Sequence, residues 1–232
     1  RRELNSRVAM VIASLFALAG FLWPLIATAV PKDAQAAVPV LALALVPVAV
    51  VALALTVDRQ MHSATTVALL GMLTAVGAAV RIAGTGVGGL EAVFIVLILS
   101  GRAFGARFGF LLGMLVISLS SVLWGGIGPW TPFQIFACGW VAAGAGLLPR
   151  ITARSQRRAA RLEVLMLVGY GILASYAFGL IMNLWFWPFA VGAGSDISYS
   201  AGAPLGQNLA SFGLYSLVTS TLTWDTVRAV TT

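Results

Sequence analysis

The chain has 232 residues, of which 60% are hydrophobic and 9% are charged, and its mean hydropathy is +0.98. A soluble domain carries about 25% charged residues, so this composition argues against a water-soluble protein and indicates a protein of the lipid bilayer. The basic residues are nearly all arginines in short breaks between apolar runs, a pattern that reports membrane orientation and argues against a nucleic-acid partner.

Two apolar runs near the start of the chain, 8–30 and 38–57, approach or exceed the roughly 20 residues that a helix needs to cross a bilayer. A polar turn at 31–35 separates them, and Pro47 inside the second run predicts a kink. We therefore expect residues 1–60 to form an N-terminal transmembrane hairpin of two spans.

Six further apolar runs predict a second unit over residues 61–232. They cover 63–82, 90–99, 108–123, 133–148, 162–188 and a last run that begins near Leu209. If the eight runs alternate in direction, one side of the membrane collects Arg1, Arg2, Arg7, Arg59, Arg102, Arg107, Arg150, Arg154, Arg157, Arg158, Arg161 and Arg228. The other side has only Lys32 and Arg81. By the positive-inside rule, this asymmetry predicts an all-α, multi-pass bundle of the cell inner membrane with both termini in the cytoplasm.

The break between the fifth and sixth of the eight apolar runs contains more special residue types than a turn requires. One proline is enough to end a membrane helix, yet residues 120–134 contain two prolines, three glycines, two tryptophans and Gln134. A glutamine is costly on a lipid-facing helix and is better placed facing a cavity. We interpret this break, with Trp124 and Trp130, as part of a binding surface on the outer side.

Other polar residues on the outer side extend this surface. Arg81 and Glu91 flank a loop, 84–89, whose four glycines permit close approach of the backbone to a ligand. The alternative, which stays open, is that both side chains only reach toward the membrane surface. Asn183, inside the seventh run, either lines the same pocket or bonds another helix.

Aromatic residues gather at the outer ends of the runs. They are Trp124, Trp130, Trp185, Phe186, Trp187 and Tyr199. Half or more of them are expected to anchor the protein at the lipid headgroups. Trp187, Tyr199 and the loop at 190–207 are also predicted to contact the ligand.

The inventory of reactive residues argues against an enzyme. Lys32, the only lysine, follows a proline and so cannot belong to a Walker A loop. His62, the only histidine, falls at the cytoplasmic edge of its run, and Cys138 lies inside an apolar run, so no cofactor and no metal site are expected. Asp225 is the one acid inside a run, and its spacing from Arg228 predicts a structural ion pair at least as well as a proton site.

A stripe of small residues marks the third run. Its members recur at three- and four-residue spacing, which places them on one helix face: Ala64, Ala68, Gly71, Ala75 and Ala79. Small residues let another helix approach closely. The stripe is either a docking face for a partner or an ordinary internal contact.

Taken together, these segments resemble the substrate-binding S component of an energy-coupling factor (ECF) transporter. The resemblance covers about 62–232 and rests on Arg81 and on the segments 100–113, 128–134, 139–148 and 219–229. Its most specific part is Gly128-Pro129-Trp130-Thr131-Pro132-Phe133-Gln134, which looks most like the cobalamin-type group, whose substrates are corrinoids.

The resemblance implies a core of six helices that captures a vitamin or related micronutrient near the outer surface. It also implies two kinds of partner, a transmembrane scaffold subunit and two ATPase subunits, with the stripe from Ala64 to Ala79 matching the family's docking segment. The hairpin over 1–60 is additional to that core, and the last helix of the family continues past the point where this chain ends, so its final span is expected to be truncated or atypical. A proton-coupled secondary carrier and a non-binding structural subunit stay open as alternatives.

Overall fold

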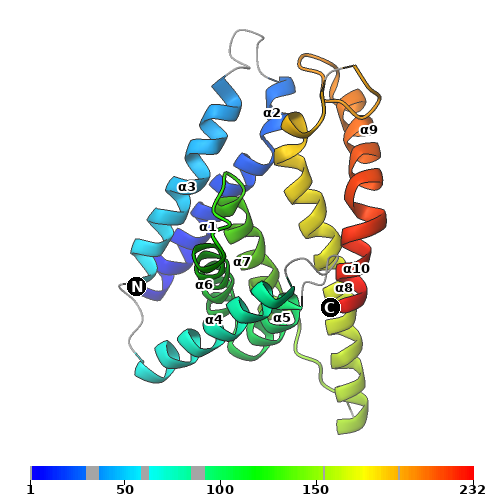
Figure 1. Ribbon diagram of the computed structural model, residues 1–232. Helices are drawn as coiled ribbons and strands as arrows, with labels where there is room; N and C mark the ends of the chain where they lie inside the picture. Colours follow the sequence, from blue (N-terminus) through cyan, green and yellow to red (C-terminus); the bar gives the residue numbers. More distant parts are fainter. Residues whose placement is uncertain (1, 30–36, 59–62, 85–91, 154, 193) are drawn as a thin grey trace.

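The computed structural model describes residues 2–29, 37–58, 63–84, 92–153, 155–192 and 194–232. The regular elements in these ranges are all helices, which confirms the predicted all-α class. In chain order they are α1 (Arg2–Phe21), α2 (Trp23–Ala29), α3 (Ala37–Asp58), α4 (Ala64–Gly84), α5 (Val93–Phe104), α6 (Ala106–Trp124), α7 (Thr131–Leu147), α8 (Gln156–Ala190), α9 (Leu205–Ser216), the π-helical segment η1 (Leu217–Asp225) and α10 (Thr226–Thr231). Figure 1 shows the last three as one continuous run beside α8.

Three of the described helices, α4, α6 and α8, are long and apolar enough to cross a membrane. Shorter apolar helical stretches lie at Val8–Phe21, Ala37–Val51 and Val93–Phe104. Many large apolar side chains point outward, as Leu165 and Leu173 of α8 do. Helix length, composition and this apolar surface together fit a multi-pass membrane protein.

The tightest packing joins α5, α6 and α7. A Cβ added at Gly101 of α5 would lie 1.9 Å from the carbonyl oxygen of Ala142 in α7, and one added at Gly113 of α6 would lie 2.6 Å from that of Cys138. Only glycine permits backbones to approach this closely. Cys138 itself is buried, as predicted for a small apolar side chain.

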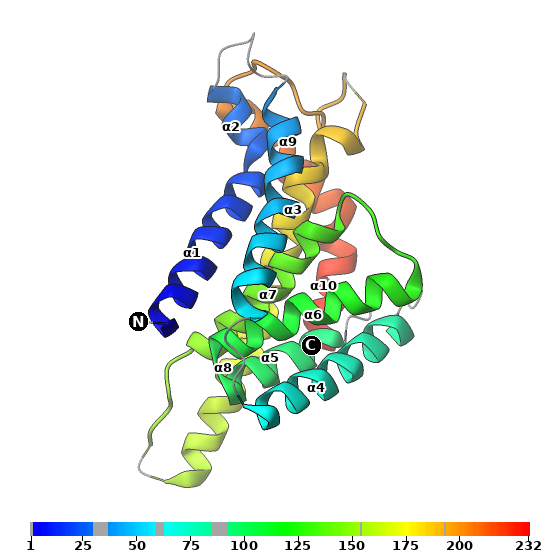
Figure 2. The ribbon, with the colours of Figure 1, turned by 90° about the vertical axis from the view of Figure 1, so that its left-hand side faces the viewer.

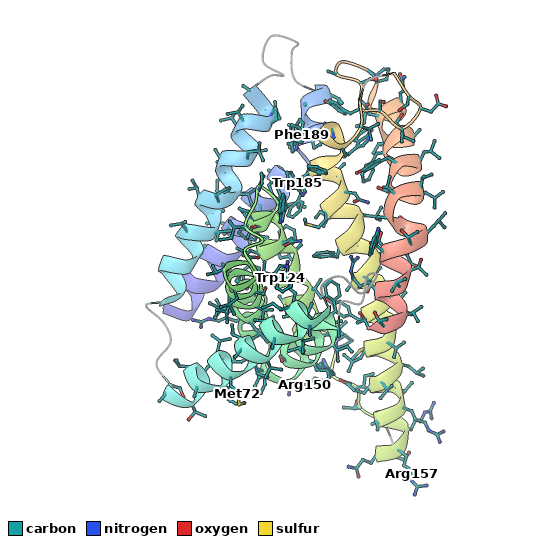
Figure 3. The ribbon with its side chains drawn as sticks, in the orientation of Figure 1. Met72, Trp124, Arg150, Arg157, Trp185 and Phe189 are labelled. Atoms are coloured by element: carbon teal, nitrogen blue, oxygen red, sulfur yellow. The ribbon has the colours of Figure 1, made fainter. Side chains whose placement is uncertain are left out.

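Helix ends meet at two opposite ends of the bundle. At one of them, Arg102 of α5 donates to the carbonyl oxygen of Leu148 at 2.7 Å and forms an ion pair with Glu163 of α8 at 2.5 Å. We call this the arginine-rich end, and its described arginines are Arg102, Arg107, Arg150, Arg157, Arg158 and Arg161. Figure 3 shows Arg150 and Arg157 there.

The N-terminal hairpin of α1, α2 and α3 packs against the other helices (Figure 2). Trp140 of α7 donates its indole N–H to Ser14 Oγ at 3.0 Å, and Trp23 donates to the carbonyl oxygen of Trp185 in α8 at 2.8 Å. The hairpin therefore contributes to the same hydrophobic core as the rest of the chain. The predicted boundary near residue 60 lies outside the described residues.

Several helices differ from the predicted runs. The single span expected over 8–30 is wrong, because the helix breaks at Leu22. Pro24 has no N–H to donate to the carbonyl of Gly20, and its ring would clash with that carbonyl in a continuous helix.

Helix boundaries elsewhere shift by a few residues. α5 covers Val93–Phe104 instead of 90–99, and the last helical run begins at Leu205 instead of near Leu209. α8 begins before the predicted 162 because Ser155 Oγ accepts the N–H of Arg158 and caps the helix. The helix α3 continues through Pro47, and a kink there stays a prediction.

Candidate functional site

Arg81 links three helices at the end of the bundle opposite the arginine-rich end. It lies in the last turn of α4. Its Nη1 donates to Ser120 Oγ of α6 at 2.8 Å, and its Nη2 donates to Gln134 Oε1 of α7 at 3.1 Å. We call these three residues the Arg81 junction, and two of them were predicted as site residues from the sequence.

The chain topology explains why these residues meet. α4 and α6 end where α7 begins, so the last turns of two helices and the first turn of a third share one end of the bundle. Ser120 is fully buried and also donates its hydroxyl to the carbonyl oxygen of Val116, four residues earlier in α6. Ser120 and Gln134 are both neutral hydrogen-bond acceptors for the guanidinium.

Two buried polar atoms without a hydrogen-bond partner lie in α6 and α8. Ser121, next to Ser120, is 1% exposed, and its Oγ has no hydrogen-bond partner among the described residues. Trp185 of α8 is 2% exposed, and its indole N–H likewise has no acceptor there. Its ring stacks on Phe133, the neighbour of Gln134, at 4.2 Å between centroids. Buried polar atoms are almost always paired, so these two are available to a ligand or to water.

The break after α6 presents the two predicted tryptophans on the surface. Trp124 is 59% exposed and Trp130 is 43% exposed. Trp130 folds over Gly128, where an added Cβ would lie 2.5 Å from the indole ring, and the Gly128 N–H donates to Thr131 Oγ1 at 2.9 Å. The break is therefore an ordered turn that holds Trp130 beside the start of α7. With Phe186, three of the six outer aromatic residues are exposed, as anchors at the headgroups would be.

Asn183 belongs to a different group of residues. Its side chain donates to Ser220 Oγ at 2.7 Å, and Ser220 donates to Asp225 Oδ2 at 2.7 Å. Asp225 in turn pairs with Arg228 at 2.8 Å. Of the two predicted roles for Asn183, the structure shows the bond to another helix, and it confirms the Asp225–Arg228 ion pair.

These four residues, which we call the buried polar chain (Asn183, Ser220, Asp225 and Arg228), lie between α8 and the last helical run. Arg228 donates to the carbonyl oxygen of Ser175, near the middle of α8, and its guanidinium lies 4.8 Å from the ring centre of Phe178. Arg228 is therefore buried between helices, and its assignment to the cytoplasmic side stays a prediction. Its ion pair and the cation–π contact stabilise the charge inside the protein.

Trp187 and Tyr199 form a third group, in the cap over the end of α8. Trp187 is fully buried, donates its indole N–H to the carbonyl oxygen of Ile197 and meets Tyr199 edge to face at 5.3 Å. Asn208 of α9 fastens the same loop through two hydrogen bonds to the backbone of Ser200. Burial raises the pKa of the Tyr199 phenol above its ordinary value, so the phenol is neutral at physiological pH. In this arrangement both aromatic side chains pack the loop, and contact with a ligand stays a prediction.

The contacts thus divide the predicted binding residues among the Arg81 junction, an exposed turn, a buried polar chain and a packed loop. Glu91 and most of the glycine-rich loop at 84–89 lie outside the described residues. Sequence reasoning missed Ser120, Ser121 and Ser220 as functional candidates. The only signal for the first two was their position as adjacent serines at the end of an apolar run.

The predicted docking stripe is uncovered. Ala64, Ala68, Gly71, Ala75 and Ala79 are all exposed on α4, whereas Leu70, Thr74, Gly77 and Ala78 face the other helices. Of the two interpretations of the stripe, an internal contact within this chain is therefore wrong for the described residues.

Comparison of the chain with protein-family models, with curated proteins and with solved structures gave no match.

Proposed function

We propose that this protein is a membrane subunit that captures a small solute, and that it serves as the substrate-binding component of an ECF-type importer for a vitamin or related micronutrient. The observation that carries the proposal is the Arg81 junction, in which a guanidinium, an amide and a hydroxyl from three helices meet at one end of an apolar bundle. Ionisable residues within membrane proteins are rare, and they often mark the path of a substrate. Cobalamin or a related corrinoid is the first substrate to test.

The distribution of charge supports an orientation for this site. Because the arginine-rich end collects six described arginines, we place it in the cytoplasm, and the Arg81 junction then faces outward from the inner membrane. A solute bound at the junction, near Trp130 and the unpaired Ser121 hydroxyl, would be reached from outside the cell. The protein itself carries out no chemistry in this proposal, and partner ATPases supply the energy.

The alternative of a proton-coupled carrier has less support. A proton relay needs an acid that can gain and lose a proton within the membrane. Asp225, the predicted candidate, is engaged in an ion pair with Arg228 and accepts a hydrogen bond from the hydroxyl of Ser220, so both of its partners are structural. A carrier would nevertheless transport its solute in proteoliposomes without any ATPase, and transport would stop when the proton gradient is collapsed.

Native mass spectrometry of the purified chain tests solute capture directly. We expect a small molecule to co-purify from cells grown in rich medium, or to bind when cobalamin and other vitamins are screened by thermal shift. An adduct of corrinoid mass supports the cobalamin assignment, and a smaller vitamin keeps capture but changes the substrate. Failure of every vitamin to bind would favour the structural-subunit alternative.

A separate prediction concerns the exposed stripe on α4. Changing Ala75 to tryptophan should block assembly with a scaffold subunit, because the bulky ring holds a partner helix away from the smooth face. Ligand binding by the isolated subunit should be unaffected. The measurement is pull-down of partner subunits alongside solute uptake in whole cells.

Val76→Trp provides the matched control. Val76 is the next residue of the same helix and is also exposed, but it lies off the stripe. Assembly that survives Ala75→Trp as well as it survives Val76→Trp would mean that the stripe is not a docking face.

A further inference from the structure

A short segment at the break between α1 and α2 contacts both α7 and α8. α1 ends at Phe21 and α2 begins at Trp23, because Pro24 interrupts the helix. Phe21 is fully buried and meets Phe133 of α7 edge to face, with 5.0 Å between the ring centroids. Trp23 is 4% exposed and donates its indole N–H to the carbonyl oxygen of Trp185 in α8 at 2.8 Å. The helix break therefore places one aromatic side chain on each of two neighbouring helices.

The two residues that this segment contacts are themselves stacked on each other. The rings of Phe133 and Trp185 are nearly parallel, with 5° between their planes and 4.2 Å between their centroids. The segment thus holds the stack from both of its sides. Gln134 of the Arg81 junction directly follows Phe133, so the stack adjoins that junction. We call the four aromatic residues the aromatic clip: Phe21, Trp23, Phe133 and Trp185.

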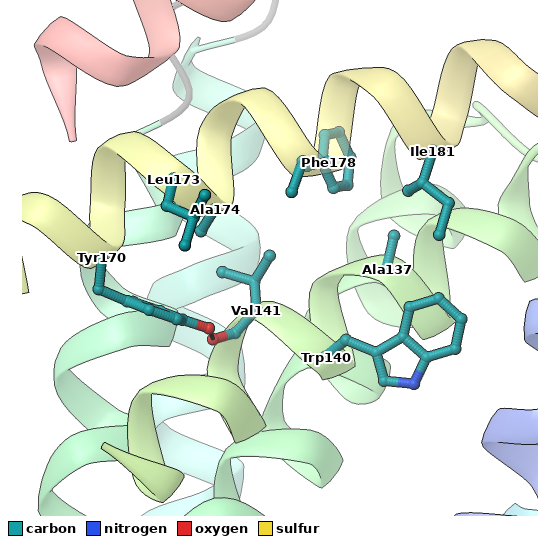
Figure 4. A pocket seen from close by; sticks show the side chains of 9 residues that line it. Ala137, Trp140, Val141, Tyr170, Leu173, Ala174, Phe178 and Ile181 are labelled. Carbon is teal, nitrogen blue, oxygen red and sulfur yellow. Dashed lines mark hydrogen bonds between the residues drawn. The ribbon is translucent and has the colours of Figure 1, made fainter. Parts of the chain in front are cut away.

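Next to the clip, α7 and α8 are separated by a pocket. It has a volume of about 220 Å³ and begins one helical turn from the stack, at Ala137 of α7 and Ile181 of α8 (Figure 4). At its far end, Tyr170 of α8 donates its hydroxyl to the carbonyl oxygen of Val141 in α7 at 2.6 Å. The two helices are thus joined on either side of a pocket, and the clip is the joint beside the Arg81 junction.

The end of α8 depends on Trp23 for a hydrogen bond. Pro188 lies inside α8 and has no N–H to donate to the carbonyl oxygen of Leu184, so this turn lacks one backbone hydrogen bond. Trp23 supplies a donor to the next carbonyl, that of Trp185. The Trp23 ring also lies 6.2 Å from the ring of Tyr199, between centroids. α2 therefore holds both the last turn of α8 and the loop that follows it.

Trp185 carries a polar atom that the closed clip leaves unused. Its indole N–H has no acceptor among the described residues, although the residue is only 2% exposed. Buried donors are almost always paired. Separation of α7 and α8 at the clip would uncover this ring and its N–H beside the Arg81 junction, where a bound solute can accept the hydrogen.

We infer that the aromatic clip is a gate. It holds α7 and α8 together beside the Arg81 junction, and the solute enters and leaves when the clip opens. Phe21 and Trp23 are the positioning residues of this gate, which gives the N-terminal hairpin a role. The inference rests on solute capture as proposed above. A weakened clip should speed entry and exit alike, because the same contacts break in either direction, whereas a damaged binding site would speed exit alone.

Hydrogen exchange of the free chain in micelles tests the gate without any solute. In the wild-type chain, the amides of α2, of 186–190 and of 194–204 should exchange together and faster than those of α6 and α7, because they open as one unit. Trp23→Phe keeps an aromatic ring but removes the N–H donor, so exchange over 186–190 and 194–204 should rise about 3- to 10-fold. Trp140→Phe is the matched control, since it removes the indole hydrogen bond to Ser14 of α1. It should leave this exchange unchanged.

Stopped-flow binding of cobalamin measures entry and exit separately. Trp23→Phe should raise the association and dissociation rate constants by a similar factor, about 3- to 10-fold, and leave Kd within about twofold of the wild-type value. Trp140→Phe should change neither rate constant. A wild-type chain that binds no cobalamin would contradict the proposed substrate, and hydrogen exchange then decides the inference by itself.

Three results would overturn the inference. One is the same exchange over 186–190 and 194–204 in the wild-type, Trp23→Phe and Trp140→Phe chains. Another is faster dissociation of cobalamin from Trp23→Phe without faster association, which would make Trp23 a residue of the binding site and not of a gate. The third is independent exchange of α2 and the end of α8 in the wild-type chain, a result that needs no variant to fold.

Discussion

Changing Asp225 to asparagine is expected to lower the free energy of unfolding by about 3–5 kcal/mol, because it leaves the buried Arg228 without its counter-charge. Asp225 and Arg228 are 1% and 6% exposed, and their ion pair joins the last helical run to α8 through Ser175. The Asp225 carboxylate packs directly against Gly179 of α8, so a larger side chain at position 225 would clash there. Asparagine has the same size as aspartate and avoids that clash. The loss is therefore electrostatic and not steric.

Equilibrium unfolding in mixed micelles measures this effect. Asp196→Asn is the control, since Asp196 is exposed in the loop before α9 and its change should alter stability by less than about 0.5 kcal/mol. The double variant Asp225→Asn with Arg228→Met should be more stable than the sum of the two single changes implies, because it removes both charges together. If Asp225→Asn behaves like Asp196→Asn, the pair does not anchor the last helical run.

The π-helical segment explains part of this arrangement. Over Leu217–Asp225 the helix is wound more loosely than an α-helix, and Ser220 and Asp225, five residues apart, hydrogen-bond directly. Thr226 likewise donates to the carbonyl oxygen of Thr221, five residues earlier. Segments of this kind are common at functional sites, and here the segment aligns polar side chains toward Asn183 on α8.

The sequence was sufficient for the features that depend on residues near one another in the chain. Long apolar runs predicted helices, and the spacing of Asp225 and Arg228 predicted their pairing. Arg81 and Gln134, 53 positions apart, were both predicted to lie on the outer binding surface, but the hydrogen bond between them was not predicted.

Features that depend on packing were not predictable in the same way. A tryptophan at the end of an apolar run has the same sequence signal whether it anchors at the headgroups, as an exposed Trp124 can, or fills the core, as Trp185 and Trp187 do. Serine is common in membrane helices and usually bonds the carbonyl four residues back, so nothing marked Ser120 as the partner of Arg81. The break at Leu22 was missed because Pro24 follows an uninterrupted apolar run.

Changing Arg81 to glutamine is expected to raise the dissociation constant of the captured solute about 10- to 100-fold, since a hydrogen bond to a charged group contributes about 1.5–3 kcal/mol. Arg81→Lys should recover only part of the affinity, because lysine keeps the charge but loses the planar fork that reaches Ser120 and Gln134 together. Gln134→Ala and Trp130→Ala should also weaken binding. Titration calorimetry with cobalamin, or with the compound that co-purifies, measures each constant.

Arg150→Gln is the matched control, because it removes the same charge at the opposite end of the bundle. The thermal midpoint of every variant separates lost binding from lost folding, which matters because Arg81 also ties α4 to α6 and α7. Unchanged affinity in Arg81→Gln, Gln134→Ala and Trp130→Ala would show that the solute binds elsewhere. The packed loop around Trp187 and Tyr199 would then be the next candidate binding site. A solute could reach Trp187 only if this loop opened, since Trp187 is fully buried in the structure.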